Sequence, residues 1–118
     1  MRFSTKPFQF RFYRAGWSDR SDELVARIKS TLDERIRGMY NLEIIDVFFK
    51  PRMAIADGVY ATPMLVKLSP LPVKKFFGCL NNVEELRKAF EVLSEDKRKM
   101  DEASGRGLAS DGLSGLQS

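Results

Sequence analysis

The sequence predicts a single α/β domain with the element order βαβαββα. Three observations predict it: a strand-helix-strand pattern in the first half, two short apolar segments in the second half, and a last segment rich in helix formers. The chain has 118 residues, 43% of them hydrophobic, which is enough for one core. We expect the domain to occupy residues 8–97, after a short extension at residues 1–7 and before a disordered, Gly/Ser-rich tail at residues 98–118.

The first half of the chain has the pattern of a βαβ unit. Phe8, Phe10 and Phe12 alternate with polar residues, which is the period of a strand buried on one face. A helix is predicted over about residues 19–37, because apolar residues recur there at helical spacing and a glycine follows. Residues 42–49 are almost continuously apolar, which predicts a strand covered on both faces and parallel to the first.

The second half predicts a short helical turn, a hairpin and a last helix. Residues 52–58 offer only a helical turn before a glycine. The apolar residues 64–68 and 73–77 are joined by a short connection that contains two prolines, so we expect them to pair as antiparallel strands. Asn82, followed closely by two glutamates, predicts the start of the last helix.

This element order is similar to the thioredoxin fold, in which a proline precedes the third strand as Pro63 does here. Thioredoxin-like enzymes place a thiolate where the first strand meets the first helix, because the positive end of the helix stabilises it. Here that place reads Ala15-Gly16-Trp17-Ser18, so thiol–disulfide exchange has no nucleophile. We therefore predict no catalytic residue.

Composition excludes several other classes of site. The chain has one cysteine, Cys79, and no histidine, so it forms no internal disulfide and no Cys/His metal set. No apolar segment approaches the roughly 20 residues of a membrane-spanning helix, and the N-terminus has no apolar core of a signal peptide, so we expect a cytoplasmic protein without a cofactor or membrane contact. The formal net charge of +4 is spread out and predicts no nucleic-acid partner. We expect Lys67, Lys74 and Lys75 to protect a sheet edge from aggregation.

Several motifs, taken in order, resemble the KaiB family of circadian clock proteins. They are Tyr13-Arg14-Ala15-Gly16, Gly38-Met39-Tyr40-Asn41-Leu42-Glu43-Ile44-Ile45-Asp46-Val47, Ala61-Thr62-Pro63-Met64-Leu65, Pro70-Leu71-Pro72-Val73-Lys74-Lys75, Gly78 and Leu80-Asn81-Asn82. The resemblance covers roughly residues 8–93. It implies a non-enzymatic regulator that binds the N-terminal ring of a hexameric KaiC-type ATPase. It also implies a role for a KaiA-like protein, and competition with a sensor histidine kinase whose own N-terminal domain is KaiB-like.

The resemblance also implies where the partner binds. In the family, the partner surface includes the end of the first helix and the second strand, which correspond here to Arg37, Gly38, Tyr40, Asn41 and Glu43. Two residues depart from the pattern, since Glu43 and Gly58 stand where clock-type members commonly have lysine. Because glutamate reverses the charge, we expect Glu43 to face a compensating positive group, or the partner to be a diverged KaiC or another protein.

KaiB proteins are known for two folds of one sequence, and the resemblance implies both for this chain. One is a monomeric, thioredoxin-like state that binds KaiC; the other is a ground state, usually a tetramer, with the order βαββααβ. Three residues bear on this switch: Pro63, if the bond before it is cis in only one state, and Ala89 and Glu91 in the last helix. Ala89 stands where clock-type members have glycine, and alanine favours a helix by about 1 kcal/mol. We therefore expect a chain that rests mainly as a thioredoxin-like monomer.

Two other functions remain open from the sequence. One is a serine-type glutathione-binding protein with Ser18 and Pro63 lining its site, although this chain lacks the acidic-Ser pair that such proteins carry after the fourth strand. The other is a domain that pairs with a histidine kinase. We also expect Trp17 to contact a partner, because it lies in a loop beside polar residues, whereas Tyr13 packs against the sheet.

Overall fold

The structure, a computed structural model, describes residues 6–106 and confirms the predicted order βαβαββα. Its elements are β1 (Phe8–Arg14), α1 (Asp19–Ile36), β2 (Tyr40–Asp46), α2 (Pro51–Ala56), β3 (Met64–Ser69), β4 (Lys74–Phe76), the 3₁₀ turn η1 (Cys79–Asn81), α3 (Val83–Ala89) and α4 (Glu91–Arg106). The helix predicted over residues 19–37 and the antiparallel hairpin are both present. The turn η1 and the helix α4 are additions to the predicted order.

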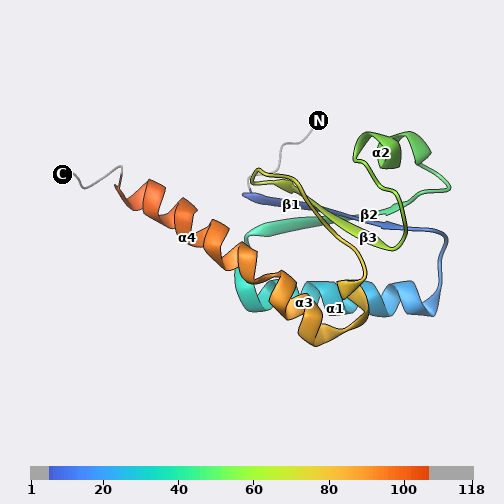
Figure 1. Ribbon diagram of the computed structural model, residues 1–118, viewed down its shortest axis with the longest axis horizontal. Helices are drawn as coiled ribbons and strands as arrows, with labels where there is room; N and C mark the ends of the chain where they lie inside the picture. Colours follow the sequence, from blue (N-terminus) through green and yellow to red (C-terminus); the bar gives the residue numbers. More distant parts are fainter. Residues whose placement is uncertain (1–5, 107–118) are drawn as a thin grey trace.

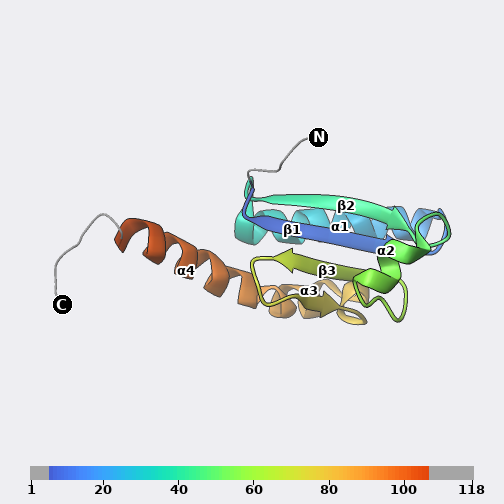
Figure 2. The ribbon, with the colours of Figure 1, turned by 90° about the horizontal axis from the view of Figure 1, so that it is seen from above.

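The strands form one sheet in the order β2-β1-β3-β4. β1 and β2 run parallel, with Phe8 opposite Tyr40 and Arg14 opposite Asp46, as the βαβ pattern predicts. β3 is antiparallel to both of its neighbours, β1 and β4. Figures 1 and 2 show α1 and α3 on one face of this sheet and the short helix α2 on the other.

The main core lies between the sheet and the helices α1 and α3. Every second residue of β1 enters it, which confirms the strand that was predicted to be buried on one face. The buried core residues are Phe8, Phe10, Phe12, Leu24, Ile28, Leu32, Ile36, Leu65, Phe76, Leu80, Leu86, Phe90 and Leu93. The rings of Phe76 and Phe90 meet edge to face, with centroids 5.1 Å apart, and so join β4 to the end of α3.

The opposite face of the sheet is only partly covered. In a small cluster on this face, Ala54 of α2 packs against four buried residues of the sheet, Tyr13, Ile45, Met64 and Val66. The prediction of a second strand covered on both faces is therefore wrong, because β2 lies at the sheet edge and the six residues of α2 reach only one end of the sheet. The apolar run continues past β2 into a turn, where the side chains of Phe48 and Phe49 are 72% and 78% exposed.

Lys67 is buried at the centre of the sheet, so the prediction that it protects an edge is wrong. It lies on β3, between β1 and β4, and its alternation with Val66 directs it to the face that carries the helices. Its Nζ is 2.8 Å from Oδ2 of Asp96 on α4, and the Lys67 side chain is fully buried. A buried charge requires a paired countercharge, so this ion pair ties α4 to the sheet.

The last helix is interrupted at Phe90, which caps α3, and the chain continues as α4. Residues 98–106, predicted as the start of a disordered tail, are helical, whereas residues 107–118 lie outside the described residues. Figure 1 shows α4 extending away from the body of the domain. Arg35 of α1 holds the joint between the two helices, because it donates to the Arg87 carbonyl at 3.2 Å and to Ser94 Oγ at 3.4 Å.

The substitution Asp96→Asn is expected to lower the free energy of unfolding by about 3 kcal/mol, because it leaves the ammonium group of Lys67 buried without a countercharge. Urea unfolding followed by circular dichroism measures this change. The double variant Lys67→Met/Asp96→Leu should lose less, since it removes both charges together.

The matched control for this experiment is Glu95→Gln. It breaks the exposed pair between Glu95 and Arg98, whose charged atoms are 2.7 Å apart, and should cost less than about 1 kcal/mol. Equal losses in Asp96→Asn and Glu95→Gln would contradict a structural role for the buried pair.

Candidate functional site

The five residues predicted to bind a partner lie together at one edge of the sheet. Arg37 caps α1, Gly38 forms the turn that follows, and Tyr40, Asn41 and Glu43 belong to β2. All of them are exposed except Tyr40, which is half-buried. We refer to these five residues as the β2 edge surface. Because β2 is the outermost strand on this side, the surface is accessible to another protein.

Gly38 sets the position of the β2 edge surface relative to α1. Its φ of +77° is in the left-handed region that L-residues rarely adopt, and an added side chain would meet nothing within 4 Å. The requirement for glycine is therefore conformational, and it confirms the predicted left-handed end of the helix. The chain then enters the sheet, where Met39 accepts a hydrogen bond from the Phe8 amide at 3.0 Å.

Tyr40 anchors β2 to α1. Its hydroxyl donates to Asp33 Oδ1 at 2.9 Å and to the Lys29 carbonyl at 3.4 Å, and its ring meets Phe10 edge to face. Burial and the hydrogen bond to Asp33 raise the pKa of Tyr40 to about 12. The hydroxyl is thus engaged by α1, and only part of the ring remains for contact with a partner.

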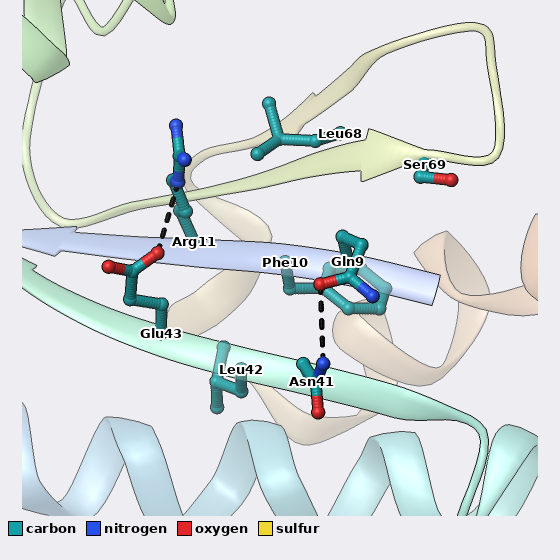
Figure 3. A pocket seen from close by; sticks show the side chains of 8 residues that line it. All are labelled: Gln9, Phe10, Arg11, Asn41, Leu42, Glu43, Leu68 and Ser69. Atoms are coloured by element: carbon teal, nitrogen blue, oxygen red, sulfur yellow. Dashed lines mark hydrogen bonds and ion pairs between the residues drawn. The ribbon is translucent and has the colours of Figure 1, made fainter. Parts of the chain in front are cut away.

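Beside this edge, the uncovered face of the sheet forms a pocket of about 510 Å³. It is lined by Gln9, Phe10, Arg11, Asn41, Leu42, Glu43, Leu68 and Ser69. Figure 3 shows Arg11 and Glu43 directed toward each other from β1 and β2, and Asn41 directed toward Gln9, to which its amide donates at 3.4 Å. Polar side chains therefore take the place of a covering helix on this face.

Arg11 is the centre of a charged network on this face. Its Nε lies 3.2 Å from Glu43 Oε1, and its Nη1 lies 2.9 Å from Asp57 Oδ2. The Tyr13 hydroxyl donates to the same Asp57 carboxylate and to the Met53 carbonyl, and burial together with the Asp57 hydrogen bond raises the pKa of Tyr13. Glu43 therefore has its compensating positive group within the chain, at Arg11.

A second pocket, of about 210 Å³, lies where β1 leads into α1. Its lining residues are Arg14, Ala15, Gly16, Ser18, Arg20, Ser21, Leu24, Thr62 and Pro63, and the Thr62–Pro63 bond is cis. The structure thus brings together Ser18 and Pro63, the two residues of the glutathione hypothesis. The Ser18 hydroxyl is, however, the N-cap of α1 and accepts a hydrogen bond from the Ser21 amide at 3.1 Å.

Tyr13 and Trp17 differ in burial as the sequence predicts. Tyr13 is fully buried, and Trp17 is 72% exposed, with the guanidinium carbon of Arg14 3.2 Å from its ring centroid.

Sequence reasoning missed Arg11 and Asp57 as site residues. Arg11 carried a signal, because it alternates with the buried phenylalanines of β1, but Asp57 lies in a turn and carried none.

The residues predicted to bear on a fold switch lie elsewhere. Pro63 lies between α2 and β3, Ala89 ends α3, and Glu91 begins α4. Ala89 is half-buried against the main core, whereas Glu91 is exposed.

Cys79 is half-buried in η1, and burial raises the pKa of its thiol. Within residues 6–106, no three His, Cys, Asp or Glu side chains gather in a way that could hold a metal ion. None of the helices in this described part of the chain is both long and apolar enough to cross a membrane.

Comparison with known sequences gives a consistent family match. The KaiB domain model matches residues 11–91. A circadian clock oscillator protein KaiB from Microcystis aeruginosa is 33% identical over 99 residues, which cover 84% of this chain and 95% of that protein. The KaiB protein from a Nostoc species is 32% identical over 101 residues, which cover 86% and 94%.

Comparison with solved structures confirms the thioredoxin-like fold. The N-terminal domain of SasA from Synechococcus elongatus has a TM-score of 0.61 at 20% identity, over 76% of this chain and 85% of that one. Oxidized mitochondrial thioredoxin 3 from Saccharomyces cerevisiae has a TM-score of 0.57 at 17% identity, over 74% and 79%. At these identities the likeness shows the fold alone.

The stability of the protein is expected to fall as the pH rises from about 10 to about 12. In this range the Tyr40 phenol of the unfolded chain loses its proton, whereas the folded chain keeps it, so the unfolded state is favoured. Tyr40→Phe should make this decline less steep, although the raised pKa of Tyr13 preserves part of it. Urea unfolding at a series of alkaline pH values measures both slopes, and equal slopes would show that the Tyr40–Asp33 contact does not persist in solution.

Proposed function

Because this chain belongs to the KaiB family of circadian clock proteins, we propose that it is a non-enzymatic regulator that binds the N-terminal ring of a hexameric KaiC-type ATPase. The observation that carries the proposal is the family match over residues 11–91, which includes α1 and the whole of β2. The protein acts by occupying the ring in the cytoplasm. There it competes with the KaiB-like domain of a sensor histidine kinase and assembles with a KaiA-like protein.

The β2 edge surface is the proposed contact with the ATPase. Four of its five residues are exposed, and they are contiguous because Gly38 turns the chain directly from α1 into an edge strand. Ile44, the residue after Glu43, is also exposed and adds apolar area to the same edge. Arginine and aromatic residues, represented here by Arg37 and Tyr40, are enriched where proteins meet.

Each of the two departures from the family pattern has a local setting that reduces its weight against a KaiC-type partner. Arg11 offsets part of the negative charge of Glu43, because the same guanidinium also pairs with Asp57. Gly58 has a φ of +73°, and a Cβ there would lie 2.7 Å from Lys75 Nζ. Any side chain at this position would be strained by the backbone and would require Lys75 to move.

We also propose that the free protein rests mainly as a thioredoxin-like monomer. Ala89 favours the helical form of α3, and Glu91 places a negative charge in the first turn of α4, where the helix dipole favours it. The buried pair between Lys67 and Asp96 is made only while α4 is helical and packed on the sheet. These contacts support this fold over an arrangement in which the same residues form a strand.

For the binding surface, Arg37→Glu is expected to weaken binding to the N-terminal ring at least tenfold, because it reverses a charge on the β2 edge surface. The matched control is Lys99→Glu, the same change of charge on the exposed part of α4, which should alter affinity less than twofold. Backbone NMR signals of the labelled protein, recorded during titration with the unlabelled ring, should broaden over residues 37–43. An unchanged spectrum after hours of incubation, or equal losses in the two variants, would direct the search to kinases and other partners.

For the resting state, chemical shifts of the free protein should be helical over residues 86–93, because α3 and α4 span this segment. Sedimentation should give one species near the monomer mass of 13.5 kDa. Strand-type shifts over residues 86–93, or a stable tetramer, would show that the alternative fold predominates. Retention on a glutathione matrix, tested on the same sample, would instead favour the glutathione-binding alternative.

A further inference from the structure

Arg14, the last residue of β1, has a buried side chain with an unmatched hydrogen-bond donor. The residue is 4% exposed, and no described residue accepts a hydrogen bond from its Nε. The nearest carboxylate oxygen, Oδ1 of Asp22, lies 3.7 Å from Arg14 Nη1, which is too far for a hydrogen bond. Because the guanidinium keeps its charge, and a buried N–H donor without an acceptor is costly, this Nε favours an acceptor from outside the chain.

The indole of Trp17 restricts the directions from which an acceptor can reach this guanidinium. The guanidinium carbon of Arg14 lies 3.2 Å from the centroid of the Trp17 ring, so one flat face of the cation is covered. Acceptors must therefore approach through the edge of the group. Oxyanions approach guanidinium groups in this way, because two oxygens can accept from two parallel N–H donors.

The pocket of about 210 Å³ at the start of α1 includes Arg14 in its lining. It contains two arginines, Arg14 and Arg20, together with the hydroxyl-bearing Ser18 and Thr62, and none of its nine lining residues is acidic. The N-terminus of α1, an 18-residue helix, forms one wall, and the aligned peptide dipoles give that end a partial positive charge. Arginine, helix end and hydroxyl groups all favour negative charge in the same place.

We propose that this pocket binds a small oxyanion, the carboxylate or phosphate group of a metabolite, with Arg14 as its principal contact. The volume is below the roughly 300 Å³ at which pockets for drug-sized ligands begin, so one anionic group with a short extension fits, rather than a large cofactor. This site goes beyond the proposed partner binding and does not depend on it. Binding of an anion at this site requires neither a cysteine nor a chemical reaction.

Asp22 is the group that competes with the ligand for Arg14. It is the one carboxylate within 4 Å of the Arg14 guanidinium among the described residues, and its side chain is 62% exposed. The carboxylate can therefore turn toward solvent when an oxyanion binds. Its removal should strengthen anion binding, whereas changes to Arg14 should weaken it, so the site makes two predictions of opposite sign.

The test is an NMR titration of the full-length, ¹⁵N-labelled protein with inorganic phosphate in one arm and acetate in the other. Sodium chloride at equal ionic strength serves as the reference in both arms. The expected result is a saturable shift of the Arg14 Nε–Hε signal and of the Asp19 and Arg20 amides, in at least one arm. The arm that saturates at lower concentration identifies the group as phosphate or carboxylate.

Variants make the assignment specific. Asp22→Asn should lower the anion concentration needed for half-saturation at least twofold, and Arg14→Met should abolish the saturable shift of the amides. If Arg14→Met does not fold, Arg20→Gln, which changes an exposed lining residue, should raise the half-saturating concentration at least threefold instead. The proposal is overturned if both arms of the wild-type titration match the chloride reference, or if Asp22→Asn weakens binding.

Discussion

The helices α1 and α3 and the start of α4 cover one face of the four-stranded sheet, and in the described part of the chain only the six residues of α2 lie on the other. Because of this asymmetry, the polar side chains of β1 and β2 that point away from α1 need hydrogen-bond or charge partners that do not come from a covering helix. Arg11 meets the requirement by pairing with Glu43 and Asp57, and Gln9 by pairing with Asn41. β2 is the outermost strand beside this polar face, so its edge is open to a partner.

The two surfaces proposed for binding are built from the chain in different ways. The β2 edge surface comes from one continuous segment, since Gly38 places the end of α1 next to β2. The pocket beside Arg14 is assembled from two separate segments: residues 14–24, which run from the end of β1 into α1, and residues 62–63 before β3. The first surface is therefore fixed by local chain geometry, whereas the second depends on how the sheet and helix pack.

This difference explains how much could be predicted from the sequence. The alternation of Phe8, Phe10 and Phe12 and the helical stripe of α1 are local patterns, and both predicted the observed elements. The apolar run after residue 42 does not indicate that α2 is too short to cover it. Lys67 was interpreted as an edge residue because its partner Asp96 lies 29 residues further along the chain. The pairing of Arg11 with Asp57, across 46 residues, was invisible for the same reason. The helical residues 98–106 were assigned to a tail because their apolar period is weak.

The ion pair between Lys67 and Asp96 also bears on how related chains can diverge. An ammonium at the centre of the sheet and a carboxylate on α4 are each harmful without the other, so neither position can change alone without passing through a weakened intermediate. Relatives that keep this packing should therefore either retain both charges or have lost both. A family member with an apolar residue at the position of Lys67 would not need an acidic residue on its last helix. The two positions can thus serve as a paired marker of how that helix is attached.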